Sequence, residues 1–274
     1  MKAYLWMLSF VVVTLGGVHA QDNAGDAKLK ADEKAKESHQ KMLMPSSKLI
    51  GLSVKDGDGE NCGNINAFAL DREGKIHYVL IGLGGLAGVG ETEIAVPWTA
   101  FQCICTMEGE KLICNPKVRL TSKQLKTAPQ LKAQSYLELT DADWSAKNAT
   151  FFQASKPVSP IAKNNLIISS KIIDGKVHGS EKETVGQLDE LMIRNGTGDV
   201  EFLVLGRGGV AGIGESYVAV AFPMLQILGE GKDISLQYRG NVASLENATK
   251  VTPSEYPELR LRSVAENAKR GESR

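Results

Sequence analysis

Short apolar runs separated by glycines and charged turns dominate the pattern of this chain. Residues 78–81, 94–98, 203–205 and 218–222 are rich in β-branched or aromatic side chains. Residues 234–238 alternate apolar and polar positions with the two-residue period of a strand. Many short strands at close spacing predict a mainly β protein whose unit is a small barrel or sandwich.

The chain also repeats itself. Residues 77–98 (HYVLIGLGGLAGVGETEIAVPW) return 124 residues later as residues 201–222 (EFLVLGRGGVAGIGESYVAVAF), and every glycine is kept. A repeat at a fixed offset indicates two copies of one fold unit. Helical pattern is sparse, with short helices expected at 121–126 and at the counterpart 242–249. The predicted organisation is two tandem small β-barrels with short helical extensions and a linker between them: residues 47–143, 144–164 (linker) and 165–262.

The two ends of the chain differ in kind from the repeats. Lys2 precedes an apolar run and a small-residue site that ends at Ala20, which is typical of a cleaved secretory signal at residues 1–20. The apolar run is too short to span a bilayer as a helix. Residues 21–46 are rich in Ala, Lys, Asp and Glu and are predicted to form a flexible charged tether, and residues 263–274 a disordered tail. We therefore expect an exported protein, periplasmic or extracellular, with no transmembrane segment in the mature chain.

The charge balance argues against some partners. The chain carries 32 basic and 32 acidic residues, and removal of the signal with Lys2 leaves 31 against 32. A nearly neutral chain gives no electrostatic reason to bind nucleic acid or anionic lipid. We expect another protein, or a second copy of this chain, as the partner.

All four cysteines lie in the first unit. The stretch from Cys103 to Cys114 resembles a hairpin that turns at 109–110, which places Cys105 opposite Cys114. Cys62 is then free to meet Cys103, although the sequence does not fix the connectivity. Export permits disulfides, whereas a metal site favours C-x-x-C spacing with histidine. Disulfides or buried thiols are therefore the preferred interpretation, and no metal site is predicted.

Two glycine-rich segments, 82–87 and 206–211, satisfy the G-x-G-x-x-[GA] pattern of dinucleotide-binding loops. That pattern needs a helix directly after the glycines, but residues 94–98 resemble a strand and contain Pro97. We therefore interpret the glycines as structural residues that supply positive φ and allow close backbone approach. Glu91 and Glu215, which follow the two loops, are interpreted as acceptors of hydrogen bonds from loop amides. The residues assigned to these loops are Gly82, Gly84, Gly85, Gly88, Gly90, Glu91, Gly206, Gly208, Gly209, Gly212, Gly214 and Glu215.

The first unit carries an ordered series of glycine and apolar motifs. In chain order they are Lys48, Leu49, Ile50, Gly51, Val54, Gly63, Asn64, Ile65, Leu70, Asp71, Gly74, Lys75, Ile76, Gly84, Gly85, Gly88, Gly90, Val96, Pro97 and Trp98. This order resembles the PRC-barrel domain, a family named for the cytoplasmic domain of the photosynthetic reaction centre H subunit, over about residues 47–105. In the second unit Ala221-Phe222 replaces Pro97-Trp98, and Asn165-Leu166-Ile167-Ile168 stands in the place given to Lys48-Leu49-Ile50-Gly51.

The resemblance implies a small β-barrel that binds proteins and carries no general set of catalytic residues. The histidines His19, His39, His77 and His178 form no pair with a nucleophile or with metal-ligand spacing. We therefore predict no catalytic residues and no cofactor. Two hypotheses follow: an exported, non-catalytic interaction or scaffold protein, or a small-molecule binding protein or enzyme with a site between the two units.

Overall fold

The computed structural model describes residues 42–84, 92–132, 136–155, 160–208, 216–231, 233–246, 248, 250–252 and 256. The predicted signal, the predicted tail and most of the predicted tether lie outside these residues. A division of the chain by internal contacts separates only residues 1–38 from the rest. The remainder of the chain, within which all described residues lie, forms the second unit.

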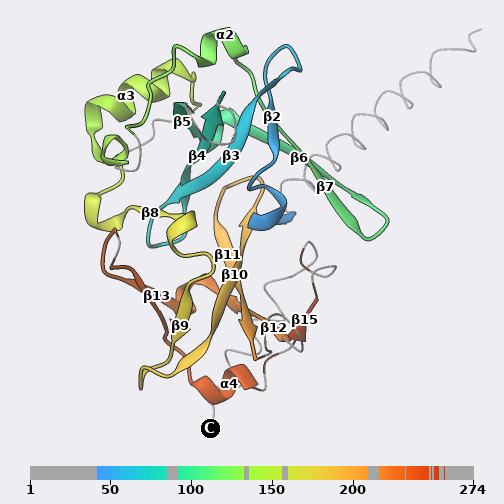
Figure 1. Cartoon of the computed structure of the whole chain (residues 1–274), viewed down its shortest axis with the longest axis vertical. Helices are drawn as coiled ribbons and strands as arrows, with labels where there is room; N and C mark the ends of the chain where they lie inside the picture. The colour runs from blue at the N-terminus through green and yellow to red at the C-terminus, as the bar shows by residue number, and fades with distance from the viewer. Residues whose placement is uncertain are drawn as a thin grey trace, which may run out of the picture. The chain divides into compact units, whose positions relative to one another are not determined.

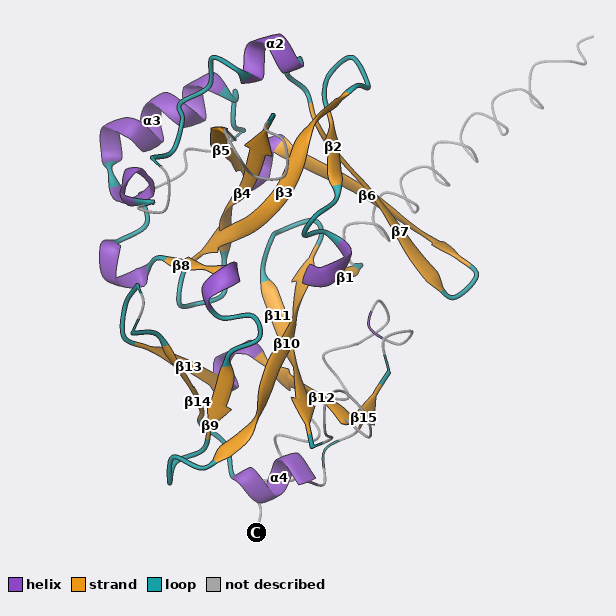
Figure 2. Cartoon of the chain, in the orientation of Figure 1, coloured by secondary structure: helices purple, strands orange, loops and turns teal. Residues whose placement is uncertain are grey.

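The described chain is mainly β, as predicted, and its strands form two sheets (Figures 1 and 2). The first sheet contains β2 (Ser53–Lys55), β3 (Asn61–Leu70), β4 (Ile76–Leu83), β5 (Thr92–Pro97), β6 (Phe101–Glu108), β7 (Lys111–Val118) and β8 (Ile167–Ile168). The second contains β1 (Leu43–Pro45), β9 (Lys176–His178), β10 (Thr184–Arg194), β11 (Val200–Arg207), β12 (Ser216–Ala221), β13 (Leu225–Leu228), β14 (Ser235–Tyr238) and β15 (Lys250–Val251).

The two sheets have the same strand order. The first runs β5-β4-β3-β2-β7-β6, and the second runs β12-β11-β10-β9-β14-β13 with β15 added beside β12. In each sheet one junction is parallel, between β2 and β7 and between β9 and β14. The sequence repeat is therefore matched by a repeat of topology.

Each half of the chain gives one short strand to the sheet of the other half. The first strand, β1, pairs with β10, and Met44 lies opposite Ile193. The equivalent strand of the second half, β8, pairs with β3, and Ile167 lies opposite Leu70. Met44 and Ile167 are 123 residues apart, as are Leu70 and Ile193, so the exchange is reciprocal.

A serine after each exchanged strand fixes the exchange. The Ser169 hydroxyl accepts a hydrogen bond from the Phe68 backbone N–H at 2.9 Å, and the Ser46 hydroxyl accepts one from the Leu191 N–H at 3.0 Å. Ser46 also donates to the Glu190 carboxylate at 2.7 Å. Both serines are buried, so each bond satisfies a backbone group that water does not reach.

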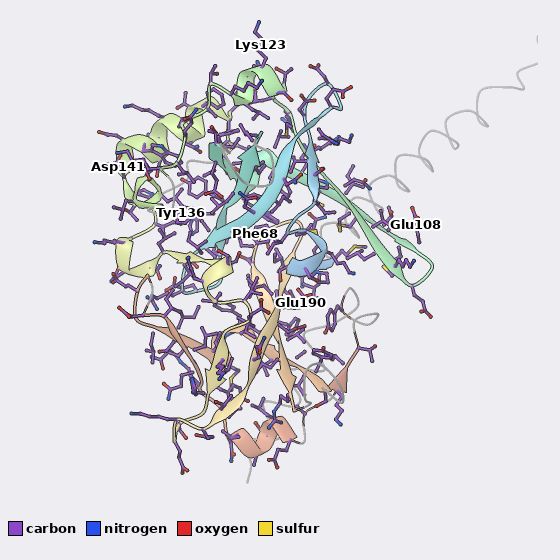
Figure 3. The ribbon with its side chains drawn as sticks, viewed as in Figure 1. Phe68, Glu108, Lys123, Tyr136, Asp141 and Glu190 are labelled. Carbon is purple, nitrogen blue, oxygen red and sulfur yellow. A yellow bond between two sulfur atoms is a disulfide. The ribbon has the colours of Figure 1, made fainter. Side chains whose placement is uncertain are left out.

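One hydrophobic core extends through both halves. A single cluster of packed side chains joins the two halves. It includes Met44 and Phe68 from the first half and Leu191, Leu203 and Leu236 from the second. Figure 3 places the labelled Phe68 and Glu190 amid the side chains of the two sheets, whereas Glu108 lies at the far end of the β6–β7 hairpin. The tether predicted at 21–46 therefore ends too late, because buried apolar residues begin at its last positions.

The opening motif of the second half lies at residues 171–174, six positions after the expected 165–168. The counterpart of Ser46–Lys48 is the 3₁₀ turn Ser169–Lys171, which has the same sequence, Ser-Ser-Lys. Gly51 is thereby equivalent to Asp174, and both have positive φ, 85° and 64°. Because aspartate tolerates this conformation better than most residues, the turn survives without its glycine.

Three α-helices lie in the part of the chain that the structure describes. Two were predicted, α2 (Ser122–Leu125) and α4 (Val242–Glu246). The third, α3 (Ala142–Phe151), lies in the segment assigned to the linker and the end of the first unit. Asp141 begins α3 by accepting a hydrogen bond from the Trp144 N–H at 2.7 Å. The helix was missed because its buried positions include polar Ser145 and Asn148, so no apolar stripe marks it.

Asp56 joins the turn before β3 to the start of α2. Its carboxylate accepts hydrogen bonds from the N–H groups of Asp58 at 2.9 Å, Glu60 at 3.0 Å and Ser122 at 2.7 Å. The Ser122 hydroxyl also donates a hydrogen bond to this carboxylate, and this bond is the largest cause that lowers the pKa of Asp56 from 3.8 to about 2. The backbone hydrogen bonds lower the pKa further, whereas burial raises it.

We expect Asp56→Asn to destabilise the protein at neutral pH and to have little effect near pH 2. Because the pKa is lower in the folded state, the carboxylate contributes stability above pH 3.8 that is lost as pH falls toward about 2. Melting temperatures of both proteins between pH 7 and pH 2 measure this. Asp58→Asn, a change of the same charge at an exposed position of the same turn, is the control. A difference in melting temperature that is constant with pH would contradict the assignment.

Candidate functional site

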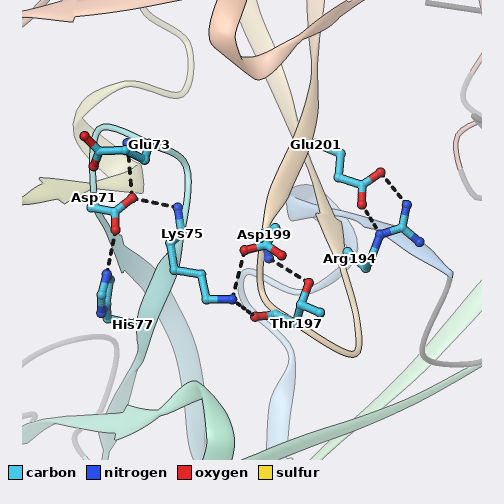
Figure 4. Close-up of polar contacts among 8 residues, drawn as sticks. All are labelled: Asp71, Glu73, Lys75, His77, Arg194, Thr197, Asp199 and Glu201. Carbon is cyan, nitrogen blue, oxygen red and sulfur yellow. Dashed lines mark hydrogen bonds and ion pairs between the residues drawn. The ribbon is translucent and has the colours of Figure 1, made fainter. Parts of the chain in front are cut away.

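The turns of the two longest hairpins meet each other. The β3–β4 turn and the β10–β11 turn exchange two backbone hydrogen bonds, from the Ile76 N–H to the Gly198 carbonyl at 2.9 Å and from the Val200 N–H to the Gly74 carbonyl at 2.8 Å. Lys75 and Asp199 pair at the centre, with 2.8 Å between Nζ and Oδ1 (Figure 4). These positions are 124 residues apart, so the contact is another reciprocal one.

Two acid–base contacts flank this contact at equivalent positions, with the acid and the base exchanged. Asp71 contacts His77, with 2.8 Å between Oδ2 and Nε2, and Glu201 contacts Arg194 through both of its carboxylate oxygens (Figure 4). Burial raises the pKa of Asp71, but hydrogen bonds from His77 and from backbone N–H groups outweigh it and leave the pKa below its usual value. Both carboxylates are paired and brace the turns, which is a structural role.

The described glycines of the two loops lie where strands approach closely or turn. Gly84 and Gly208, which follow β4 and β11, have φ of 71° and 70°. Gly82 faces Gly63 so closely that a Cβ atom on Gly63 would lie 2.0 Å from the Gly82 carbonyl oxygen; a Cβ on Gly186 would lie 2.8 Å from the Gly206 oxygen. The other loop residues, Gly85, Gly88, Gly90, Glu91, Gly209, Gly212, Gly214 and Glu215, lie outside the described residues.

The context of the glycine loops differs from that of a dinucleotide-binding loop. Each loop is followed by a strand, β5 or β12, that pairs antiparallel with the strand before it. A dinucleotide loop instead leads into a helix whose N-terminus holds the pyrophosphate. This geometry supports the structural interpretation of the described glycines.

The cysteines gather on the β6–β7 hairpin, with one exception. Cys105 and Cys114 face each other across the hairpin and form a disulfide. Cys62 and Cys103 are free thiols, so the pairing considered for them is absent: Cys62 contacts the Val54 carbonyl, whereas the Cys103 sulfur lies 3.5 Å from that of Cys105. Burial raises the pKa of Cys103 to about 12 and, together with the charge of Asp56, that of Cys62 to about 11.

The outer strands of the two sheets are covered to different extents. A bridge between Ile94 and Gln130 covers part of β5, and β15 pairs with β12. Arg72 donates to the carbonyls of Ile227 and Gly229 at the end of β13 and its turn. The residue equivalent to Arg72 is Asn195, which reaches β6 only at the Cys103 carbonyl, at 2.9 Å.

Among the described residues, the β6–β7 hairpin therefore presents β6 as an outer strand without cover beyond Cys103. Figure 1 shows this hairpin extending away from β2 and β3. Ile104 is 49% exposed and Met107 is 42% exposed, and both lie on β6. An exposed outer strand with large apolar side chains is a template for another polypeptide segment.

A cavity of about 310 Å³ lies beside the exchanged strand β8. Both halves of the chain contribute to it, and its wall mixes apolar side chains with two lysines and one glutamate. The residues that line it are Tyr136, Leu137, Thr140, Lys163, Leu166, Ile168, Lys171, Glu230, Gly231 and Ile234. Burial, and to a smaller extent the charge of the nearby Glu93, raises the pKa of Tyr136 to about 12. A cavity of this volume is large enough for a small ligand.

Sequence reasoning missed the residues that connect the halves, above all Ser46, Ser169, Arg72 and Asn195. The repeated Ser-Ser-Lys triplets at 46–48 and 169–171 were the available signal. Arg72 and Asn195 differ in type, so only their common position in the fold reveals their common role.

Within the described residues no helix has the length and apolar character needed to cross a membrane. No curated protein is significantly similar in sequence to this chain. A family model does match the first half. Residues 43–117, which include β1 to β7 up to Lys117, match the PRC-barrel domain.

Proposed function

We propose that this chain is an exported, non-catalytic protein-interaction or scaffold protein built from two PRC-barrel-like units. The match at residues 43–117 supports the first unit. The same strand order in the second sheet and the repeat of residues 77–98 at 201–222 support the second. Export rests on the signal-like pattern that ends at Ala20.

The observation that carries the docking role is the contrast between two equivalent outer strands. Leu228 and Ile104 are equivalent and both exposed, but Arg72 covers the carbonyls beside Leu228. On β6 the exposed apolar side chains Ile104 and Met107 lie on opposite faces of the strand, and the described residues cover its outer edge only at the Cys103 carbonyl. The partner we propose is an extended, apolar protein segment that adds to β6, since strand addition combines backbone hydrogen bonds with side-chain contacts.

We expect a photoreactive amino acid at position 104 to cross-link to a discrete protein in the native host. The same amino acid at Lys123, an exposed position on α2, is the matched control. Mass spectrometry of the product distinguishes a second copy of this chain from a different protein. Met107→Glu should reduce the yield of the cross-link from position 104, because it places a charge on the outer strand to which the segment adds. Equal yields from positions 104 and 123 would contradict the proposal.

The alternative function is binding of a small molecule in the cavity beside β8. Its combination of apolar side chains with Lys163 and Lys171 favours an amphiphilic carboxylate. Such a ligand should raise the melting temperature of the protein, and Lys171→Glu should abolish the shift. Ligand-induced stabilisation that survives Lys171→Glu would exclude this site as its origin.

A further inference from the structure

Four sulfur atoms converge at the base of the β6–β7 hairpin. The sulfurs of Cys103, Cys105 and Cys114 all lie within 4.8 Å of one another. The thioether sulfur of Met44, from the exchanged strand β1, lies 3.4 Å from the Cys105 sulfur. All four side chains are nearly buried, with Cys114 the most accessible at 9% exposure.

The sulfurs have the spacing of a single metal site once the disulfide is open. A metal–thiolate bond of about 2.3 Å separates two sulfurs on one ion by about 3.7 to 4.0 Å, for tetrahedral and trigonal geometry respectively. Cys103 and Cys105 already lie 3.5 Å apart without an ion. Opening the Cys105–Cys114 bond needs only a small separation of two side chains that face each other across the hairpin.

We propose that the reduced protein binds one Cu(I) ion through Cys103, Cys105 and Cys114, with Met44 as a fourth, weaker ligand. Thiolate and thioether sulfurs are soft ligands that select Cu(I), whereas Mg²⁺, Ca²⁺ and Mn²⁺ prefer oxygen ligands. A thioether is a usual ligand for copper, while the common zinc sites use Cys, His and carboxylate. Because the four side chains are nearly buried, dissolved oxidants have little access to an ion bound by them.

The disulfide makes the site dependent on redox state. A dithiol reductant transfers two electrons and two protons to the Cys105–Cys114 bond and becomes a disulfide itself, which leaves two thiols in the protein. Cu(I) then binds without a change in its own oxidation state and displaces thiol protons to solvent. In the oxidised protein two of the three thiolates are unavailable, so the site is closed to the ion.

This site is separate from the proposed docking strand, although both use β6. Cys103 and Cys105 are buried, whereas the neighbouring Ile104 is exposed, because successive side chains of a strand point to opposite faces. Ile104→Glu should therefore abolish protein docking and leave copper binding unchanged. The two proposals fail independently.

The test is an anaerobic titration of the full reduced chain with Cu(I) against a chromogenic Cu(I) chelator. We expect one Cu(I) per chain, copper–thiolate absorption in the ultraviolet, and sulfur-only coordination in the X-ray absorption spectrum. The oxidised protein should leave the copper with the chelator. One equivalent of Zn²⁺ that resists displacement by Cu(I) would overturn the assignment of the ion.

Three substitutions make the test specific. Cys103→Ser retains the Cys105–Cys114 disulfide, so its fold is verified from the melting temperature of the oxidised protein, and we expect its Cu(I) affinity to fall at least about tenfold. Met44→Leu conserves volume and should weaken binding less. Cys62→Ser is the matched control, since Cys62 bonds the Val54 carbonyl elsewhere in the sheet. The proposal is wrong if the reduced wild type binds no Cu(I), or if Cys62→Ser weakens binding as much as Cys103→Ser.

Discussion

Gly198→Val should lower the free energy of unfolding by about 2 to 6 kcal/mol, since positive-φ strain and overpacking each cost about 1 to 3 kcal/mol. Gly198 has a φ of 75°, a conformation that β-branched residues strongly disfavour. A Cβ atom there would also lie 2.9 Å from the ring of Trp98. That ring is buried and packs against the rings of Phe68 and Phe101, at centroid distances of 6.4 and 5.6 Å, so it has little room to move.

Gly84→Val is the matched control for Gly198→Val. Gly84 has nearly the same φ, 71°, but a Cβ atom there meets nothing within 4 Å among the described residues. We expect it to cost only the strain, about 1 to 3 kcal/mol. Chemical denaturation of both variants measures the difference, which is the contribution of the Trp98 contact. Equal destabilisation by the two variants would show that the ring moves aside freely.

Gly84→Val also tests the role of the first glycine loop. If Gly84 is a structural residue, the variant loses stability and the wild-type protein binds no nucleotide. Micromolar nucleotide affinity in the wild type that disappears in Gly84→Val, with little change in melting temperature, would contradict the structural interpretation and favour a ligand-binding function.

The second large effect concerns the two halves of the chain. We expect residues 42–158 and residues 159–262 to fail to fold as separate monomers and to recover native structure when they are mixed. Each fragment carries a strand that belongs to the other: β1 completes the sheet of β10, and β8 completes that of β3. Separation also exposes the shared core and leaves the Phe68 and Leu191 N–H groups without their serine acceptors.

Circular dichroism and sedimentation velocity of the fragments, alone and mixed, measure this effect. The uncut chain is the reference for the native spectrum. Self-association of one fragment is compatible with the exchange, because β1 can pair with the β3 of a second copy in place of β10. A folded, monomeric fragment with a cooperative melting transition would show that the halves are independent domains.

The exchange explains why the predicted division into two units describes the repeat better than the fold. The repeat at an offset of 124 is a property of the sequence alone, and the topology repeats with it. Which sheet each strand joins depends on contacts between residues more than a hundred positions apart, such as Ser46 with Glu190. Local pattern carries no record of such contacts.

Local pattern predicts the β-rich class, the hairpin at 103–114 with Cys105 opposite Cys114, and the helices α2 and α4. These features depend on a few neighbouring residues, since the period of a strand, a two-residue turn and the capping Thr121 each act over a short stretch of chain. Helix α3 is not predicted by local pattern, because its packing against β5 uses the polar Asn148, which donates to the Ala95 carbonyl at 3.0 Å. The meeting of Met44 with the hairpin cysteines was decided by tertiary structure alone. The sequence by itself therefore determined the elements and their duplication, since those depend on neighbouring residues. Only the tertiary structure decided which strands are exchanged and which sulfurs meet, since both depend on burial shared between distant segments.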